Sequence, residues 1–282
     1  MASDGSGSTA LRIFVVVIAC CVLTLVLVLR GFPYDMLARR LAGEFEATTG
    51  TRVAFGALEP KLTIGGPGFE ATGVRIQTAN GTLFQIDRAS LRPAWSLAWL
   101  RRSAAVHADV ESAGGNLEGV LILGSQPGFS GQLETVDLAR LPIENFWPGI
   151  ELQGILDADV DLATTDAGPE GTLVLHAVEG SVYTADLPMP LPFQTADGEL
   201  RFGDGSLVEV SRFETTGPLF SADIKGSIGR GASASAAPLD LQVSYKVDPQ
   251  MSSTLQSIGM KTGRDGSGRI RIRGTPSSPR FE

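Results

Sequence analysis

The sequence predicts a mainly β protein in which a transmembrane helix and an amphipathic helix precede a body of antiparallel strands. Three observations predict this class: a long uncharged stretch near the N-terminus, an apolar–polar alternation of period two from Thr51 onward, and 34 glycines with only 7% aromatic residues. The predicted organisation is a disordered tail over 1–11, a transmembrane helix over 12–30, an amphipathic helix over 31–50 and a β-rich domain over 51–282.

Composition limits the classes of function. A chain of 282 residues with 43% apolar content can bury a core, so the body is not expected to be disordered. The net charge of -8 argues against a nucleic-acid partner, because phosphate binding relies on Lys and Arg. Cys20 and Cys21, the only cysteines, are adjacent in the apolar stretch, so no disulfide is expected to hold the body together.

The predicted membrane anchor is an uncharged run of seventeen residues bracketed by Arg12 and Arg30. As a helix it spans about 25 Å, and the long stems of the two arginines extend it toward a hydrocarbon core of ~30 Å. Its thirteen Ile, Leu, Val and Phe residues give roughly -4 to -8 kcal/mol for insertion. The run consists of Ile13, Phe14, Val15, Val16, Val17, Ile18, Ala19, Cys20, Cys21, Val22, Leu23, Thr24, Leu25, Val26, Leu27, Val28 and Leu29.

Three other interpretations of this run fit less well. A cleaved signal peptide needs a shorter apolar region and a small-residue cleavage site. A lipoprotein signal ending at Cys20 leaves nine more apolar residues on an exposed N-terminus. A buried core helix does not fit a helix that is apolar all round at this end of the chain. Charge gives no clear membrane orientation, since Arg39 and Arg40 follow the run and, by the positive-inside rule, oppose an orientation with the N-terminus in the cytoplasm.

The segment after the anchor predicts an amphipathic helix that starts at Pro33 and is capped near Gly50. Its apolar residues recur at helical spacing, while charged residues occupy the other positions. Two placements stay open for it, a lid packed on the end of the β body and a helix resting on the membrane surface. The apolar face is made of Tyr34, Leu37, Leu41 and Phe45, with Ala38 and Ala42.

The body predicts strands with one buried face. Apolar residues alternate with three aspartates from Leu156 to Leu162, and with polar residues from Leu239 to Val247. Phe220 to Ile228, Val106 to Val110 and Arg269 to Arg273 repeat the pattern. A meander of neighbouring antiparallel strands is the simplest topology, with Asn80-Gly81, Gly203-Asp204-Gly205 and Gly263-Arg264-Asp265-Gly266 as turns. A Gly-x-Leu strand start recurs at Gly115, Gly171 and Gly198, which indicates either a ladder-like repeat or ordinary hairpin strands.

Four segments interrupt the strands. The sequence predicts short helices or apolar excursions over 93–102 and 138–149, a loop over 227–238 and a helix over 249–260.

The search for catalytic and metal sites leads to the prediction of a non-enzymatic protein without cofactor or metal. The two histidines, His107 and His176, lie far apart at ordinary strand positions. Asp157, Asp159 and Asp161 resemble the start of a calcium loop, but Leu162 stands where glycine is required, so a solvated strand face is expected. No phosphate-binding loop, dinucleotide fingerprint or nucleophile elbow occurs.

The whole pattern resembles the type II secretion system protein N family, GspN. The resemblance rests on the segments 30–34, 49–60, 69–76, 86–93 and 268–281, and it extends over nearly the whole chain. The wider group of AsmA-like envelope proteins has similar openings and similar ends, Gly-Thr-x-x-x-Pro-x-Phe. The resemblance implies a single-pass bacterial inner-membrane protein with its N-terminus in the cytoplasm and its β body in the periplasm.

The resemblance also implies an elongated, curved sheet with an apolar concave face, which periodicity alone does not distinguish from a closed core. Two functions follow. The first is an accessory, non-catalytic subunit of type II secretion, bound to the inner-membrane platform or the secretin. The second is an AsmA-like protein that binds or transfers acyl lipids. A surface hydrolase is a third hypothesis, for which the sequence identifies no pair of catalytic carboxylates.

Overall fold

The computed structural model describes the β body and a few residues of the helix that precedes it. The described residues are 36, 38–39, 42–43, 46, 52–63, 66–77, 83–94, 104–123, 126–141, 143, 149–165, 168–184, 189–203, 206–231, 236–248, 263, 265–275 and 278–282.

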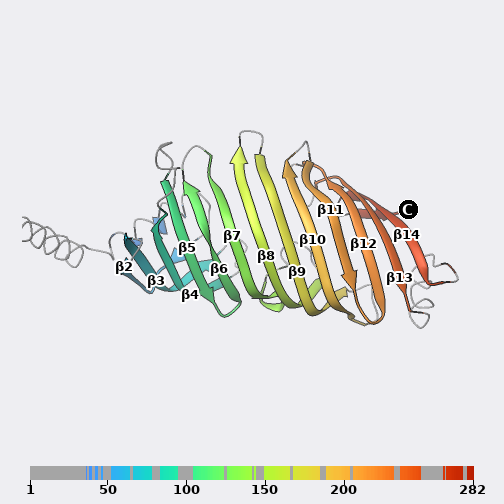
Figure 1. Ribbon diagram of the computed structural model, residues 1–282, viewed down its shortest axis with the longest axis horizontal. Helices are drawn as coiled ribbons and strands as arrows, with labels where there is room; N and C mark the ends of the chain where they lie inside the picture. The colour runs from blue at the N-terminus through green and yellow to red at the C-terminus, as the bar shows by residue number, and fades with distance from the viewer. Residues whose placement is uncertain are drawn as a thin grey trace, which may run out of the picture.

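The described body is a single 15-stranded antiparallel sheet, curved and unclosed (Figure 1). From β3 to β15 every strand pairs with its neighbours in the sequence, while β1 and β2 both pair with β3. The predicted meander is therefore confirmed. The strands are β1 (Arg52–Ala54), β2 (Ala57–Thr63), β3 (Gly66–Gln77), β4 (Leu83–Pro93), β5 (Ala104–Ser112), β6 (Gly115–Leu123), β7 (Gly128–Asp137), β8 (Ile150–Thr165), β9 (Gly168–Thr184), β10 (Leu191–Gly203), β11 (Ser206–Thr216), β12 (Phe220–Ile228), β13 (Leu239–Val247), β14 (Ser267–Thr275) and β15 (Ser278–Phe281), with a 3-10 helix, η2 (Leu138–Arg140), after β7.

All five alternating segments of the sequence lie in strands, within β5, β8, β12, β13 and β14. The expected Gly-x-Leu strand start holds for Gly115 but is wrong for Gly171 and Gly198, which lie inside β9 and β10. Both glycines fall inside because these strands are long, at 17 and 13 residues, and begin upstream. The similar segments are thus parts of hairpin strands, and no repeating unit begins at these glycines.

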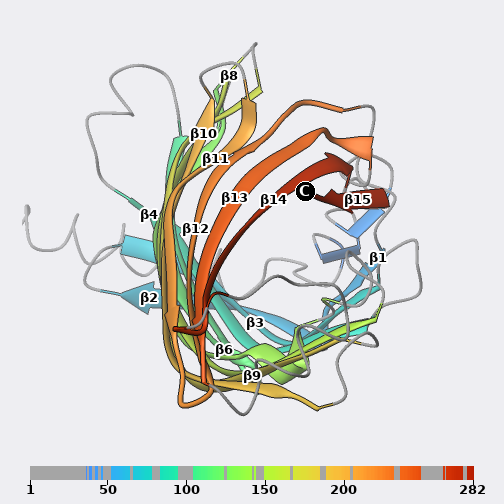
Figure 2. The same ribbon diagram turned by 90° about the vertical axis from the view of Figure 1, so that its right-hand side faces the viewer.

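The sheet bends along its strands into a trough that is open on one side (Figure 2). Register shifts interrupt the ladders of β7 with β8, β8 with β9, β10 with β11 and β11 with β12. Positive φ values at Thr135, Gly154 and Glu179 accompany the first two of these shifts. Bulges on neighbouring strands increase the local bend and twist, so we attribute the curvature of the trough to them.

The core lies within the layer rather than between two layers. Buried apolar residues form two clusters, one around Phe193, Ala177, Ala196 and Leu138 of η2, the other around Tyr245 and Val247. Among the described residues no large side chain is fully buried. The sheet is therefore stabilised mainly by backbone pairing and by contacts between neighbouring strands.

Aromatic rings that lie over glycines supply part of these contacts. A Cβ atom at Gly198 of β10 would lie 2.9 Å from the ring of Phe213 on β11, and one at Gly131 would lie 2.8 Å from the ring of Phe129. The ring of Tyr245 covers Gly268 of β14 in the same way. Each glycine leaves room for a ring, which comes from a neighbouring strand at Gly198 and Gly268 and from the same strand at Gly131. The rings therefore bury apolar area without a second layer.

The N-terminal predictions lie almost wholly outside the described residues. The anchor from Ile13 to Leu29 and the helix-face residues Tyr34, Leu37, Leu41 and Phe45 belong there, as do the turn at Asn80-Gly81 and the helix expected over 249–260. Searching the described residues for a membrane span finds no helix of sufficient length and apolar character.

Six described residues of the expected amphipathic helix are helical, namely Met36, Ala38, Arg39, Ala42, Gly43 and Glu46. Ala38 and Ala42 line a hollow of about 370 Å³ together with residues of β1 and β2. The Arg52 Nε of β1 donates a hydrogen bond of 2.8 Å to the Glu46 Oε1 atom. These contacts join the described helical residues to β1 and β2, and the placement of the whole amphipathic helix, as a lid or on the membrane surface, stays a prediction.

Candidate functional site

The sheet has one apolar face and one charged face. In the register of β7, β8 and β9, Leu133 pairs with Ala158, which pairs with Leu175, and Phe129 pairs with Leu162. A rung is a row of residues paired across neighbouring strands. The rungs that alternate with these bring together Gln132, Asp159 and Val174 in one row and Ser130, Asp161 and Thr172 in another. Because residues paired across strands share a face, the apolar rungs line one face from β4 to β14.

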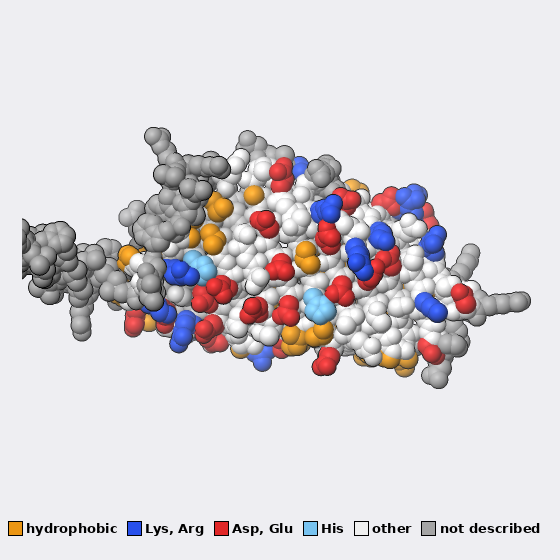
Figure 3. Space-filling model, viewed as in Figure 1, with side chains coloured by type: hydrophobic (Ala, Val, Ile, Leu, Met, Phe, Trp, Pro, Cys, Tyr) orange, Lys and Arg blue, Asp and Glu red, His pale blue; other side chains and the backbone are white. Residues whose placement is uncertain are grey.

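The charged face is the convex one. It faces the viewer in Figure 3, where acidic, basic and histidine side chains are scattered over the described surface and apolar ones form only small patches. Figure 2 shows that the strands bend away from this side, so the apolar rungs line the concave face. Asp157, Asp159 and Asp161 are exposed on β8, which confirms the expected solvated strand face.

Both histidines lie on the convex face beside a carboxylate of a neighbouring strand. The His176 Nδ1 atom lies 2.6 Å from the Asp197 Oδ1 atom, and the His107 Nε2 atom lies 3.2 Å from the Glu118 Oε1 atom. These pairs are partly solvated cross-strand contacts, far from the apolar rungs. In the strand register His176 also lies opposite Asp157 of β8, so it has an aspartate on each side.

Ion pairs on the convex face shift several pKa values. The hydrogen bonds from the Arg271 guanidinium lower the pKa of Asp240, and the hydrogen bond from Lys61 lowers the pKa of Glu70. The hydrogen bond with Glu214 raises the pKa of Arg212. All three pairs hold the charged form of the side chain, which suits a structural role at a solvated surface and supplies no group poised for proton transfer.

The concave face is only partly covered in the described structure. Phe69 and Leu91, which are cross-strand neighbours of β3 and β4, are 38% and 41% exposed, and Leu123 at the end of β6 is 42% exposed. Most other apolar side chains of this face are half-buried. A soluble domain normally buries such a face against a second layer, so an extended apolar trough is a candidate binding surface.

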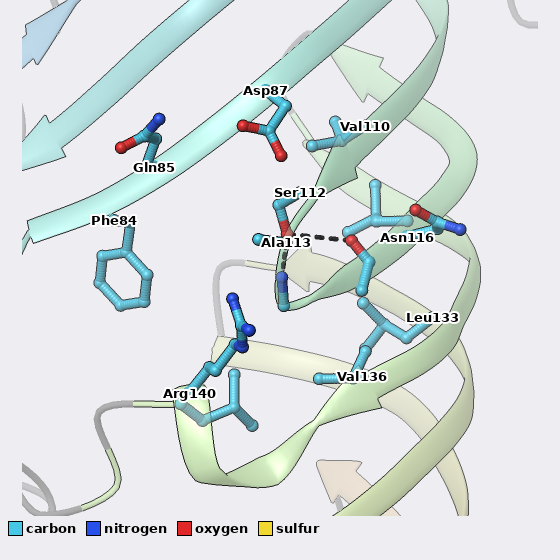
Figure 4. A pocket seen from close by; sticks show the side chains of 14 residues that line it. Phe84, Gln85, Asp87, Val110, Ser112, Ala113, Asn116, Leu133, Val136 and Arg140 are labelled. Atoms are coloured by element: carbon cyan, nitrogen blue, oxygen red, sulfur yellow. Dashed lines mark hydrogen bonds between the residues drawn. The ribbon is translucent and has the colours of Figure 1, made fainter.

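A cavity of about 600 Å³ opens on this concave face beside the β5–β6 turn (Figure 4). Its walls are made of both apolar and polar side chains. The lining residues are Phe84, Gln85, Asp87, Val110, Ser112, Ala113, Gly114, Gly115, Asn116, Leu117, Leu133, Val136, Arg140 and Leu141.

Local structure fixes one side of this cavity. Asp137 ends β7, its backbone N–H donates a 2.9 Å hydrogen bond to the carbonyl of Gly114, and its Oδ1 atom accepts one from the Ala139 N–H. The Asp137 Oδ2 atom also accepts a 3.1 Å hydrogen bond from the Arg140 Nε atom. The β5–β6 turn and η2 are therefore tied together, with Arg140 held at the wall.

No residue of this cavity was predicted as a site residue from the sequence. Asp87 and Arg140 are far apart in the chain and belong to no motif, so only the fold brings them to one cavity. In the described part of the chain, no group of three or more His, Cys, Asp or Glu side chains is arranged to hold a metal ion.

Comparison with known proteins identifies no relative, since no family model, no curated protein and no solved structure matches the chain.

Proposed function

We propose that this chain is a non-catalytic protein of the bacterial cell envelope whose trough binds the acyl chains of lipids. The observation that carries the proposal is the apolar concave face of an open sheet, with exposed side chains such as Phe69 and Leu91 at one end. The resemblance to AsmA-like envelope proteins supports the same function. The anchor predicted over 12–30 would hold the trough next to the inner membrane, with the body in the periplasm.

The dimensions of the trough agree with this ligand. The fourteen strands of the continuous path from β1 to β15 leave thirteen gaps, which at about 4.8 Å each give a length of about 60 Å. One leaflet of a ~30 Å hydrocarbon core measures about 15 Å, so several acyl chains fit end to end along the sheet. Each buried CH₂ group contributes about 0.8 kcal/mol, and a chain therefore gains substantially from leaving water.

A matched pair of substitutions on β9 tests the proposal. Leu175 faces the trough and Val174, its neighbour in the chain, faces the convex side. We expect the full-length protein, purified from membranes in mild detergent, to retain lipid in native mass spectrometry. We expect Val174→Glu to retain as much lipid as the wild type and Leu175→Glu to lose most of it, because the charge lies among the acyl chains.

The controls are the far-UV circular dichroism spectrum of each variant and a second concave substitution, Leu162→Gln. Absence of bound lipid from the wild type would contradict the proposal. Equal retention by well-folded Leu175→Glu and Val174→Glu would contradict it as well, since binding would then not depend on the concave face.

The second candidate function is an accessory subunit of type II secretion, bound to the inner-membrane platform or the secretin. The resemblance to the GspN family favours it, as does the C-terminal edge of the sheet. Among the described pairings, β15 covers β14 only from Ile272 to Thr275, with a further backbone pair between Arg271 and Glu282. Gly268 to Ile270 are left as a short edge at which a partner strand could add, because the backbone groups of Ser267 are already bonded to Asp265 and Gly263.

Gene deletion tests this second candidate. Loss of exported enzymes from the medium, with the secretion machine assembled, would support a role in secretion. Unchanged secretion would eliminate it and leave the lipid-binding proposal as it stands. A proline at Arg269, which lies on the edge portion of β14, should weaken binding of a partner strand because proline lacks the backbone N–H.

A further inference from the structure

We infer that the cavity beside the β5–β6 turn binds the head group of a zwitterionic lipid that carries both an ammonium and a phosphate group. This inference rests on the proposed function and names the ligand class of the same trough. It starts from a place on the concave face where apolar walls and charged side chains of both signs meet.

Asp87 and Arg140 supply the two charges. They reach the cavity from different elements, Asp87 from β4 and Arg140 from η2, and Figure 4 shows them at opposite sides of the pocket in that view. The Asp87 side chain is exposed and has no ion-pair or hydrogen-bond partner among the described residues. It is therefore available to an ammonium group of a ligand.

Arg140 is held in place by its neighbour. Asp137 binds its Nε atom at 3.1 Å, and the aliphatic part of the side chain lies near Gly114, where a Cβ atom would be 3.6 Å from the Arg140 Cβ atom. The two Nη groups have no acceptor among the described residues, so they can donate to phosphate oxygens in the forked geometry that guanidinium favours. The held side chain loses little freedom on binding.

The remaining lining connects the head-group position to the trough. Phe84, Leu133 and Val136 form apolar walls, and Leu133 continues through its cross-strand partners Leu117 and Ala158 into the apolar rungs. A ligand with its polar end between Asp87 and Arg140 thus has a continuous apolar surface for its chains. Ser112 is not free to bind the head group, because its Oγ atom donates to the Gly115 carbonyl and accepts from the Gly114 N–H.

The charge pair selects against other lipids. An anionic lipid such as phosphatidylglycerol offers phosphate to Arg140 but leaves the Asp87 carboxylate without a cation. A neutral diacylglycerol satisfies neither group. Phosphatidylethanolamine satisfies both, so the preference between lipids should depend on Asp87 and overall phosphate recognition on Arg140.

A competition experiment tests the inference. Full-length protein in mild detergent is mixed with equal amounts of dioleoyl phosphatidylethanolamine, phosphatidylglycerol and diacylglycerol, and bound lipids are counted by native mass spectrometry. We expect the wild type to prefer phosphatidylethanolamine over phosphatidylglycerol by about tenfold, as one charge-assisted contact provides. Asp87→Asn should abolish this preference, and Arg140→Gln should reduce both phospholipids to the level of diacylglycerol.

Matched controls on the convex face carry the same chemical changes. Asp109→Asn on β5 and Arg212→Gln on β11 should leave the lipid ratios unchanged. Far-UV circular dichroism checks the folding of each variant, and Arg140→Lys, which keeps the charge, should retain part of the phosphate preference. O-phosphoethanolamine, which has no acyl chains, should not displace the lipid at equal concentration.

The outcomes separate this inference from the function on which it rests. Lipid bound with equal ratios in the wild type and Asp87→Asn would overturn the head-group assignment and leave the trough proposal intact. Displacement by O-phosphoethanolamine at equal concentration would assign the cavity to a soluble ligand and overturn it too. If no lipid binds to any variant, both the inference and the proposed function fail.

Discussion

Replacing Gly198 by alanine tests whether the rings that lie over glycines hold this single-layer sheet together. The new Cβ atom would lie 2.9 Å from the Phe213 Cδ2 atom and 3.0 Å from two carbons of Leu175. Carbon atoms prefer about 3.5–4.0 Å, so both side chains must move by roughly 0.5–1 Å. Overpacking of this kind costs about 1–3 kcal/mol, while alanine in a strand recovers about 0.5–1 kcal/mol relative to glycine.

We therefore expect Gly198→Ala to lower the free energy of unfolding by about 0.5–2 kcal/mol in the wild type. In a Phe213→Ala background the ring contact is gone and only the contact with Leu175 remains, so the same change should cost less than in the wild type. The double-mutant cycle then yields a coupling energy of about 0.5–2 kcal/mol.

Urea unfolding of the full-length protein in mild detergent, followed by far-UV circular dichroism, measures all four free energies. Phe129→Ala, which removes a ring from Gly131 and leaves Gly198 untouched, serves as the control background. An equal cost of Gly198→Ala in the wild type and in Phe213→Ala would refute the reasoning, because the ring would then not occupy the position of the methyl group.

Three further outcomes follow from the structure. Gly171→Ala should lower the free energy of unfolding by at least about 1–3 kcal/mol in urea, since the backbone φ is +137° and the Cβ atom would meet the Asp161 carbonyl. The pKa of Asp240 is lowered in the folded state, so its contribution to stability is present above the ordinary aspartate pKa and is lost as pH falls through the folded value. Asp240→Asn should therefore weaken the fall in the free energy of unfolding at acid pH. Burial raises the pKa of Tyr245, so stability should fall as pH rises above the ordinary tyrosine value, and Tyr245→Phe should remove this loss, as alkaline unfolding curves will show.

Strand positions and the polarity of each face could be predicted from the sequence, because they depend on local alternation. The aspartates of β8 fall on the solvated face and the apolar residues of β13 on the other, as expected. The bulges could not be predicted, since Thr135 and Glu179 take positive φ without any sequence signature. Their conformations depend on strand registers that the long hairpins impose.

The head-group cavity also lay beyond sequence reasoning. Asp87 and Arg140 are separated by three strand connections and share no motif, and the sequence around either residue alone indicates only a solvated charge. They meet at one cavity because β4, β5, β6 and β7 pair side by side in the meander and η2 follows β7. The Gly114-Gly115 pair was visible in the sequence, but its contact with Asp137 and Val136 was not.

Photocrosslinking from the two faces of β9 most directly tests the claim that the concave side holds acyl chains. A photoreactive amino acid is placed at Leu175 or at Val174 in cells, and adducts of the purified full-length protein are identified by mass spectrometry. The trough predicts lipid adducts from Leu175 and none above background from Val174. Adducts from neither position, or equal adducts from both, would contradict it.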